Sequence, residues 1–261
     1  MRVVICALAK NEHLYINEWV KHYVELGVDK IYLYDNDDKT SPYIGNYING
    51  KYADKIKIID IRGMSGTCMQ HTIYSSFYRK YGTTFDYCLF CDIDEFLVGI
   101  DNIKSWLSNM NAPQIRIKWR LFGDDNVIKR DIKVPVIDFF KQEVVDIPHE
   151  RKDQGKFIIK GHLGNIFFNS CHFASVGKKP LPSVLPSGKP CNSTIVINED
   201  YSEETIYLNH YMTKTLDEFI KQKLNRNDAV FNKSLKLDYF WRINKQSEEK
   251  LQYLKDKGLM K

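Results

Sequence analysis

The 261-residue sequence contains no apolar run long enough to cross a membrane. Its first apolar stretch, Val3–Ala9, is also too short for a typical signal peptide and is more typical of a strand. The six cysteines lack the spacing of a disulfide framework, so we interpret them as reduced thiols. Cys88 and Cys91 have CxxC spacing, but residues three apart on a strand face opposite sides, and we interpret both as core residues.

The sequence also lacks several motifs that would point to particular chemistry. It contains no GxGxxG, P-loop or HExxH motif and no serine nucleophile elbow. It shows no internal repeat and no low-complexity segment. With 43% hydrophobic and 27% charged residues, the composition is that of a globular protein with one large α/β domain or two small ones.

The positive charge is weak and is concentrated at the C-terminal end. Residues 209–261 contain twelve Lys and Arg against seven Asp and Glu, an excess equal to the net charge of the whole chain, +5. Such a segment could rest on an anionic membrane or bind phosphates, and a solvated helical face is the alternative. The charge is too weak to favour nucleic acid as a partner. We therefore expect a cytoplasmic protein, with peripheral contact at the inner face of the plasma membrane as an added hypothesis.

Strand and helix patterns alternate through the first third of the chain. This order predicts an α/β fold with a mostly parallel sheet flanked by helices. The second half is less regular and predicts a smaller, mixed part. The expected strands are Val3–Ala9, Lys30–Tyr34, Lys55–Ile61, Tyr87–Cys91, Gln114–Leu121, Lys156–Ile159 and Ile166–Phe168. The expected helices are Leu14–Leu26, Thr67–Tyr81, Thr215–Asn225 (capped by Thr215) and Glu248–Lys257. We expect Lys178–Asn192 to be a loop.

Two aspartates follow the buried strand that ends at Cys91. Asp92 and Asp94 would point the same way on a strand, because strand side chains repeat every second residue. Paired carboxylates suit a hard cation such as Mg²⁺ or Mn²⁺, and such a cation could hold a diphosphate. The pair therefore predicts chemistry on a nucleotide-activated substrate, with a solvated turn as the alternative.

Polar clusters follow two other expected strands, at Lys10–Glu12 and Asp35–Asp38. Ligands of parallel sheets bind beyond the carboxyl ends of the strands. We therefore expect these clusters and Asp92–Glu95 to meet at one edge of the sheet.

A longer series of motifs resembles a known family. In chain order it consists of Ala9-Lys10-Asn11-Glu12, Glu18-Trp19, His22-Tyr23, Gly27, Tyr34-Asp35-Asn36-Asp37, Gln70, Asp92-Ile93-Asp94-Glu95-Phe96, Trp119, Phe122-Gly123, His172, Asn209-His210-Tyr211, Thr213-Lys214 and Glu218-Phe219. The set is similar to glycosyltransferase family 92 and its bacterial relatives in the GT-A superfamily. The resemblance covers nearly the whole chain.

The resemblance implies a GT-A fold, dependence on Mn²⁺ or Mg²⁺, and a UDP-sugar donor, with UDP-galactose the best-known type. It implies inverting transfer of a hexose to a glycan or glycolipid acceptor such as lipopolysaccharide or capsule. It also implies a nucleotide-sugar-binding half at residues 1–125, an acceptor-side half at 126–214 and a basic helical segment at 215–261. The chain lacks the membrane anchor of animal and plant members, which indicates a bacterial enzyme.

The resemblance also assigns the metal site. Asp92, Asp94 and His210 would form it, with Asp94 as the direct ligand and Asp92 on the ribose or on a metal-bound water. Glu95 would point away from the pair, in a structural salt bridge or at a helix start. Lys214 and Lys160 would bind the diphosphate as point charges, with a solvated lysine as the alternative for each.

Nucleotide contacts are expected from the first two strand ends and from the helix after the third strand. Side chains there can hydrogen-bond uracil and ribose hydroxyls, and turn formation is the alternative reading. The expected contacts are Asn11, Glu12, Asp35, Asp37 and Gln70.

Inverting transfer needs a general base for the acceptor hydroxyl. Asp124 or Asp125 is the best candidate by position, although relatives usually carry small hydroxylated residues there, and Glu150 is an alternative. Trp119 and Phe122 could stack on a sugar ring or belong to the core. The competing function is a metal-dependent phosphoesterase or nucleotidyltransferase, because paired carboxylates also serve phosphoryl chemistry.

Overall fold

A computed structural model describes the backbone of residues 1–261 and every side chain except that of Arg151. The strands are β1 Val3–Ala9, β2 Lys30–Asp35, β3 Ile56–Asp60, β4 Tyr87–Phe90, β5 Glu95–Val98, β6 Gln114–Leu121, β7 Gly155–Lys160, β8 Ile166–Phe167, β9 Ser175–Val176, β10 Lys179–Pro180, β11 Ser183–Val184, β12 Pro190–Cys191 and β13 Tyr207–His210. The helices are α1 Ile16–Glu25, α2 Met69–Tyr81, α3 Ile103–Leu107, α4 Val136–Phe139, α5 His149–Lys152, α6 Leu216–Gln222, α7 Leu237–Phe240 and α8 Glu248–Asp256, with short 3₁₀ turns at Ile44–Tyr47, Gly50–Lys55 and Gly82–Thr84.

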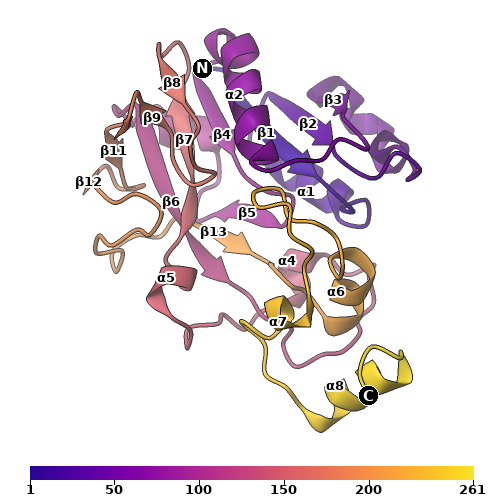
Figure 1. Cartoon of the computed structure of the whole chain (residues 1–261). Helices are drawn as coiled ribbons and strands as arrows, with labels where there is room; N and C mark the ends of the chain where they lie inside the picture. Colours follow the sequence, from indigo (N-terminus) through magenta and orange to yellow (C-terminus); the bar gives the residue numbers. More distant parts are fainter.

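One mixed sheet crosses the whole molecule. Its strand order is β12-β11-β6-β7-β4-β1-β2-β3, and β13 joins β6 and β5 to it. The pairs β4–β1, β1–β2 and β2–β3 are parallel, whereas β7 is antiparallel to both β4 and β6. A second, three-stranded antiparallel sheet consists of β8, β9 and β10. The predicted α/β class, with a mostly parallel sheet and a smaller mixed part, is confirmed (Figure 1).

Helices cover both faces of the parallel strands, which explains why all seven residues of β1 are buried. Alternate residues of β1 enter different clusters: Ile5 packs on the side of Trp19 in α1, and Cys6 on the side of Phe77 in α2. Cys88 and Cys91 likewise lie in different clusters, both buried and both free. The interpretation of these two cysteines as core residues on opposite faces is therefore confirmed.

The predicted boundaries need three corrections. β4 ends at Phe90, so Asp92 and Asp94 lie in the turn before β5, where Glu95 N–H donates to the Asp92 carbonyl (3.2 Å), and the strand alternation argument was wrong for them. The expected loop Lys178–Asn192 contains the short strands β10, β11 and β12, because its backbone pairs with neighbouring strands. The helix expected to run to Asn225 ends at Gln222.

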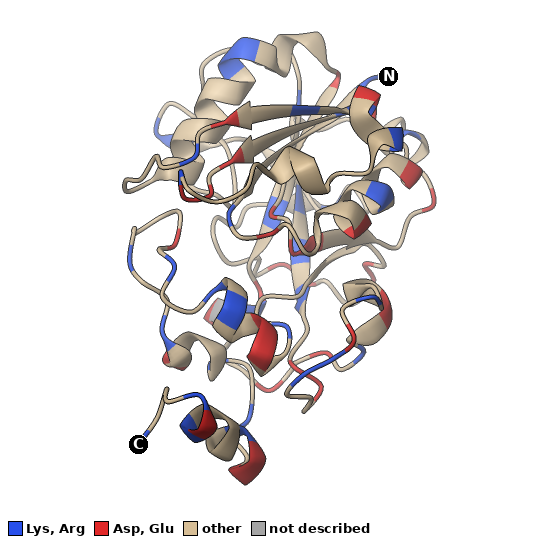
Figure 2. Ribbon diagram, turned by 90° about the vertical axis from the view of Figure 1, so that its right-hand side faces the viewer, with Lys and Arg blue, Asp and Glu red and all other residues tan. Residues whose placement is uncertain are grey.

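The C-terminal helix α8 lies at the edge of the molecule, away from the parallel strands (Figure 1). It carries acidic and basic residues together, as Figure 2 shows for both kinds of charge along the ribbon. Among the described residues, no helix is both long enough and apolar enough to cross a membrane.

Candidate functional site

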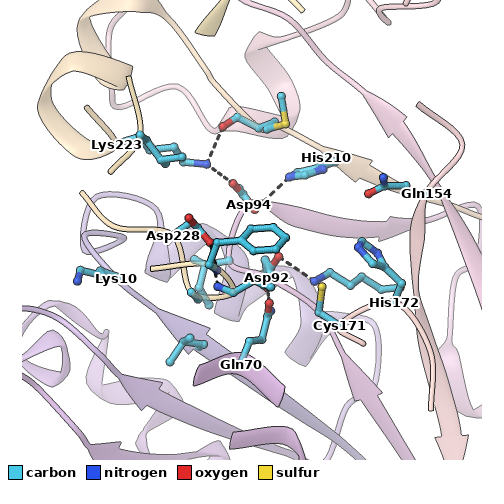
Figure 3. Close-up of a pocket in the computed structure, with 18 of the residues that line it drawn as sticks. Lys10, Gln70, Asp92, Asp94, Gln154, Cys171, His172, His210, Lys223 and Asp228 are labelled. Carbon is cyan, nitrogen blue, oxygen red and sulfur yellow. Dashed lines mark hydrogen bonds and ion pairs between the residues drawn. The ribbon is translucent and has the colours of Figure 1, made fainter. Parts of the chain in front are cut away.

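A cavity of about 750 Å³ lies at the carboxyl ends of β1, β2 and β4. Each of these strands contributes lining residues from the loop that follows it: Glu12 after β1, Asn36 after β2, and the Asp92–Asp94 turn after β4. The start of α2 adds Gln70 (Figure 3). The expectation that these loops meet at one edge of the sheet is therefore confirmed.

The opposite wall of the cavity comes from β6, β7 and β13, which follow the parallel strands in the chain. Trp119 on β6, Lys156 on β7 and His210 on β13 line it, together with His172. The ring centroids of Trp119 and His210 are 4.5 Å apart, and those of Trp119 and His172 are 5.4 Å apart. This wall is thus aromatic, whereas the wall at the parallel strand ends is polar.

Asp94 is buried between two basic side chains. Lys223 Nζ lies 2.5 Å from Asp94 Oδ2, and His210 Nε2 lies 3.5 Å from Asp94 Oδ1 (Figure 3). Burial by itself would raise the pKa of Asp94, but the charges of Lys223 and His210 hold it well below its usual value. Asp94 is therefore an anion throughout the neutral range, and a lysine compensates its charge.

Asp92 is paired with a second lysine. Lys156 Nζ lies 2.9 Å from Asp92 Oδ2, and Gln70 Nε2 donates to Asp92 Oδ1 at 2.5 Å. Burial would lower the pKa of Lys156, but Asp92 and Glu95 raise it well above its usual value. Lys156 is only 1% exposed, so it is a buried cation, and its ion pair with Asp92 holds it at the cavity wall.

The buried side chain of Glu95 stabilises the Asp92–Asp94 turn. Its side chain is fully buried, Oε2 accepts a hydrogen bond from Asp92 N–H at 2.9 Å, and Oε1 lies 4.0 Å from Lys156 Nζ. Burial, with the neighbouring carboxylates, raises the pKa of Glu95 well above its usual value. Glu95 therefore has a structural position beneath the turn, next to Lys156, whereas the predicted helix start is wrong, since Glu95 begins β5.

Other basic groups meet at Glu12. Arg226 donates to Glu12 Oε1 at 3.1 Å and also to the carbonyl oxygen of Lys10. Lys214 Nζ lies 3.9 Å from Glu12 Oε2 and 4.0 Å from the ring centroid of Tyr15. Burial lowers the pKa of Lys214, and the described cavity lining includes Arg226 but not Lys214.

Of the expected nucleotide contacts, the structure brings Glu12, Gln70 and Asp92 to the cavity. Asp35 is instead fully buried and accepts hydrogen bonds from Ile44 N–H (2.9 Å) and Asp37 N–H (3.2 Å). Asp37 accepts from Asn11 N–H, and Asn11 Nδ2 donates to the Gln222 carbonyl. Asn11, Asp35 and Asp37 thus hold the loops together, and they do not belong to the described lining.

The expected general bases also lie outside the described lining of the cavity. Asp124 is buried, and its Oδ2 lies 2.5 Å from Lys250 Nζ of α8. The Asp125 carboxylate accepts from Lys141 N–H (2.8 Å) and Gln142 N–H (3.2 Å). Neither geometry supports proton transfer in the cavity.

The remaining expected residues divide in the same way. Trp119 lines the cavity, but Phe122 is stacked on Tyr211 in the core, with centroids 4.9 Å apart. Lys160 is distant from the site and donates to Asn111. Glu150 lies on α5, outside the described lining.

Sequence reasoning missed Lys156, Lys223 and Arg226, which all line the cavity. A signal was available for Lys223, because it lies four residues after Phe219, on the apolar face of the expected helix. Lys156 stands at the start of an expected strand, and only the pairing of β7 with β4, which aligns Phe157 with Phe90, brings it opposite the acidic turn.

We tested whether these residues fit the Mn²⁺ or Mg²⁺ ion implied by the motifs. Asp94 and His210 do lie together, but every carboxylate oxygen of Asp92 and Asp94 already faces a protein side chain: Gln70, Lys156, Lys223 or His210. In the part of the chain with described side chains, no group of three or more His, Cys, Asp or Glu residues could hold a metal ion. The donor set therefore does not fit a preformed divalent-metal centre.

Comparison with known proteins gives only a distant likeness. No family model and no curated protein matches the chain. Part of the fold is similar to crystal structures of S. aureus TarS: the 1–349 fragment (16% identity, TM-score 0.38, 61% of this chain and 47% of that one), the same fragment with UDP-GlcNAc (15%, 0.38, 61% and 45%) and TarS itself (15%, 0.39, 61% and 28%). The chain spans less than half the length of each. Because the TM-scores are below 0.4, the membership in a glycosyltransferase family expected from the motifs stays a prediction.

Proposed function

We propose that this protein is a glycosyltransferase that moves a hexose from a nucleotide-sugar donor to a hydroxyl group of a glycan or glycolipid. UDP-galactose is the favoured donor, and lipopolysaccharide or capsule the favoured type of acceptor, on the strength of the motif resemblance. The observation that carries the proposal is the cavity itself. It places Lys156, Lys223 and Arg226 between a polar wall at the parallel strand ends and an aromatic wall containing Trp119.

The charges of the cavity suit the leaving group of this reaction. In an inverting transfer, the acceptor oxygen forms a bond to the anomeric carbon while the bond from that carbon to the diphosphate oxygen breaks. The acceptor proton goes to a base, and the nucleoside diphosphate departs with the bonding electrons. Fixed cations near the departing oxygens stabilise this developing charge, and ammonium and guanidinium groups are suitable donors.

The two walls suit the two ends of a nucleotide-sugar. The polar wall offers Glu12, Asn36 and Gln70 as hydrogen-bonding groups for a base and a ribose. Trp119, on the other wall, offers an apolar ring face for a hexose. A nucleotide half at 1–125 and an acceptor half at 126–214 remain part of the proposal, with Trp119 as a residue of the first range that lies on the hexose wall. The segment after residue 214 contributes Lys223 and Arg226 to the cavity.

The competing reading, a metal-dependent phosphoesterase or nucleotidyltransferase, relies on carboxylates that hold metal ions on both sides of a phosphate. No observation in the described cavity favours this arrangement over glycosyl transfer.

Calorimetric titration with uridine, UMP and UDP tests the proposal. We expect affinity to rise with each phosphate, because the cations contact the phosphates rather than the base. Trp119→Ala should weaken binding of UDP-galactose and leave UDP binding unchanged, and Lys160→Ala, far from the cavity, is the matched control. Failure of wild-type protein to bind any nucleoside diphosphate would overturn the proposal.

A further inference from the structure

We propose that Lys156 and Lys223 take the place of a divalent cation at the Asp92–Asp94 turn, so that the cavity binds the diphosphate of its ligand without a metal ion. The identity of the ligand rests on the proposed function. The inference that no metal ion is needed rests on Lys156 and Lys223, which do not belong to the acidic motif.

Each aspartate of the turn is already neutralised. Asp92 Oδ2 is 2.9 Å from Lys156 Nζ, and Asp94 Oδ2 is 2.5 Å from Lys223 Nζ. In a metal-dependent site these carboxylates would be free to compensate a doubly charged ion. Here such an ion would have to approach two ammonium groups, which repel it, or displace them from their partners.

Neither lysine can easily turn away into water. Lys156 and Lys223 are 1% and 4% exposed, and both line the cavity. They come from different elements, Lys156 from β7 and Lys223 from the position directly after α6. Figure 3 shows Lys223 beside Asp94. A buried ammonium is retained only where anions compensate it, and the two aspartates provide that compensation.

Both ammonium groups retain capacity to donate to a ligand. An ammonium group has three N–H donors. Among the described contacts, Lys156 Nζ has one within hydrogen-bond distance, to Asp92, and Lys223 Nζ has two, to Asp94 and to the Met212 carbonyl at 2.6 Å. Each ammonium therefore keeps at least one N–H donor beyond these contacts, available to a ligand in the cavity that both residues line.

The overall charge of the cavity also favours an anion. The described lining contains five cations (Lys10, Lys156, Lys223, Arg226 and Arg242) and four carboxylates (Glu12, Asp92, Asp94 and Asp228). The excess is positive before any metal ion is added. Glu95 cannot serve as a further metal ligand, because it is fully buried beneath the turn and bound to Asp92 N–H.

Calorimetry of UDP binding in EDTA and in Mn²⁺ tests this inference. Wild-type protein should bind UDP equally well in both buffers, and Mn²⁺ titrated alone should show no stoichiometric site. Lys156→Gln and Lys223→Gln should each weaken UDP binding by about ten- to hundredfold, the range expected for one charge-assisted hydrogen bond.

Matched controls come from the same elements. Lys221→Gln changes an exposed lysine of α6 that pairs with Asp217 (2.6 Å), and Lys160→Gln changes the other end of β7. Both should bind UDP like wild type. The double variant Asp94→Asn/Lys223→Gln keeps the buried pair neutral, and thermal unfolding identifies the variants that fold.

Binding that requires Mn²⁺, or a 1:1 Mn²⁺ site in the free protein, would overturn the inference and leave the proposed function standing. Folded Lys156 and Lys223 variants that bind UDP like wild type would also overturn it. Absence of UDP binding in both buffers would overturn the proposed function and this inference with it. If the lysine variants do not fold, the comparison of the two buffers on wild type still decides.

Discussion

At the residue scale, lysines and aspartates form close pairs, two of them at the cavity and one outside it. Lys223 lies against Asp94, Lys156 against Asp92, and Lys250 against Asp124. Removing one member of such a pair leaves the other charge buried and uncompensated, which costs far more than the pair itself contributes. Loss of function in any of these variants must therefore be separated from loss of stability.

Asp124 offers a test of that separation. Asp124→Asn should lower the free energy of unfolding by about 3–5 kcal/mol, because Lys250 is left buried without its partner. The folded variant should bind UDP and transfer sugar normally, since Asp124 lies outside the described cavity lining. Urea unfolding and calorimetry measure the two effects.

Asp125→Asn is the control, because its carboxylate accepts from backbone N–H groups and, in the described structure, pairs with no lysine side chain. A stable Asp124→Asn protein that binds UDP normally but has lost activity would contradict this expectation. That result would restore the general-base role suggested by its position in the sequence.

How far the sequence predicts the site depends on the kind of residue. Asp94 and His210 were expected to lie together, because the family resemblance assigns both to one site, and their side chains are 3.5 Å apart. Lys156 could not be placed, because its direction depends on the β4–β7 register. The helical spacing from Phe219 was a signal for Lys223, but it did not show where α6 ends. Asp35 was misread as facing the ligand, because a turn-forming aspartate and a ligand-binding one look alike in sequence.

At the scale of elements, α6 sets the position of Lys223. Thr215 caps the helix by accepting from Glu218 N–H, and the Glu218 side chain accepts from Thr215 N–H, as predicted from the sequence. Arg130 donates to both carboxylate oxygens of Glu218 at 3.1 Å. The start of the helix is thus fixed, and Lys223 follows its last residue.

Thr215→Ala should therefore affect both stability and binding. Loss of a cap costs about 0.5–2 kcal/mol, and loosening of α6 should also weaken UDP binding through Lys223. Denaturant unfolding and calorimetry measure these changes.

Ser247→Ala, which removes the cap of α8, is the matched control. It should destabilise the protein by a similar amount without changing UDP affinity. Equal effects of the two variants on UDP affinity would show that α6 does not position Lys223.

The elements of the first half were predicted more accurately than those of the second, for a physical reason. β1 and β2 are covered on both faces and read as continuous apolar runs, whereas β10, β11 and β12 are two residues long and exist only through pairing with other strands. A sequence pattern cannot show such pairing. The strand before the acidic turn ends at Phe90, one residue earlier than expected, so strand alternation does not set the direction of Asp92.

At the scale of the whole molecule, the basic C-terminal segment closes the cavity. Lys214, Lys223 and Lys250 are buried, so part of its positive excess faces inward rather than toward solvent. The expected contact with an anionic membrane stays a prediction that depends on its exposed lysines. The inward-facing residues instead connect this segment to the parallel strand ends.

The pH dependence of folding provides a further test. Burial, together with the charge of Lys156, lowers the pKa of His172 to about 3. Between this value and its usual pKa near 6.5, the unfolded chain binds a proton that the folded protein does not, so His172 makes stability fall as pH falls through this window.

His172→Gln should remove this contribution. Between pH 6.5 and pH 5, wild type should lose about 1.6 kcal/mol more than the variant, because the slope rises from about 0.7 to about 1.4 kcal/mol per pH unit as the unfolded histidine becomes protonated. Urea unfolding at both pH values measures the difference. Parallel pH profiles of the two proteins would show that His172 protonates equally in the folded and unfolded states.

Product analysis with UDP-galactose labelled in the sugar tests the central claim most directly, with water or a glycan as acceptor. The proposed reaction breaks the bond between the anomeric carbon and the diphosphate, so the nucleotide product should be UDP, and the label should appear in free or transferred galactose. Release of UMP with galactose 1-phosphate would contradict the account. It would show that the cavity cleaves the phosphoanhydride by attack at phosphorus, as a nucleotidyltransferase does, rather than the bond to the anomeric carbon.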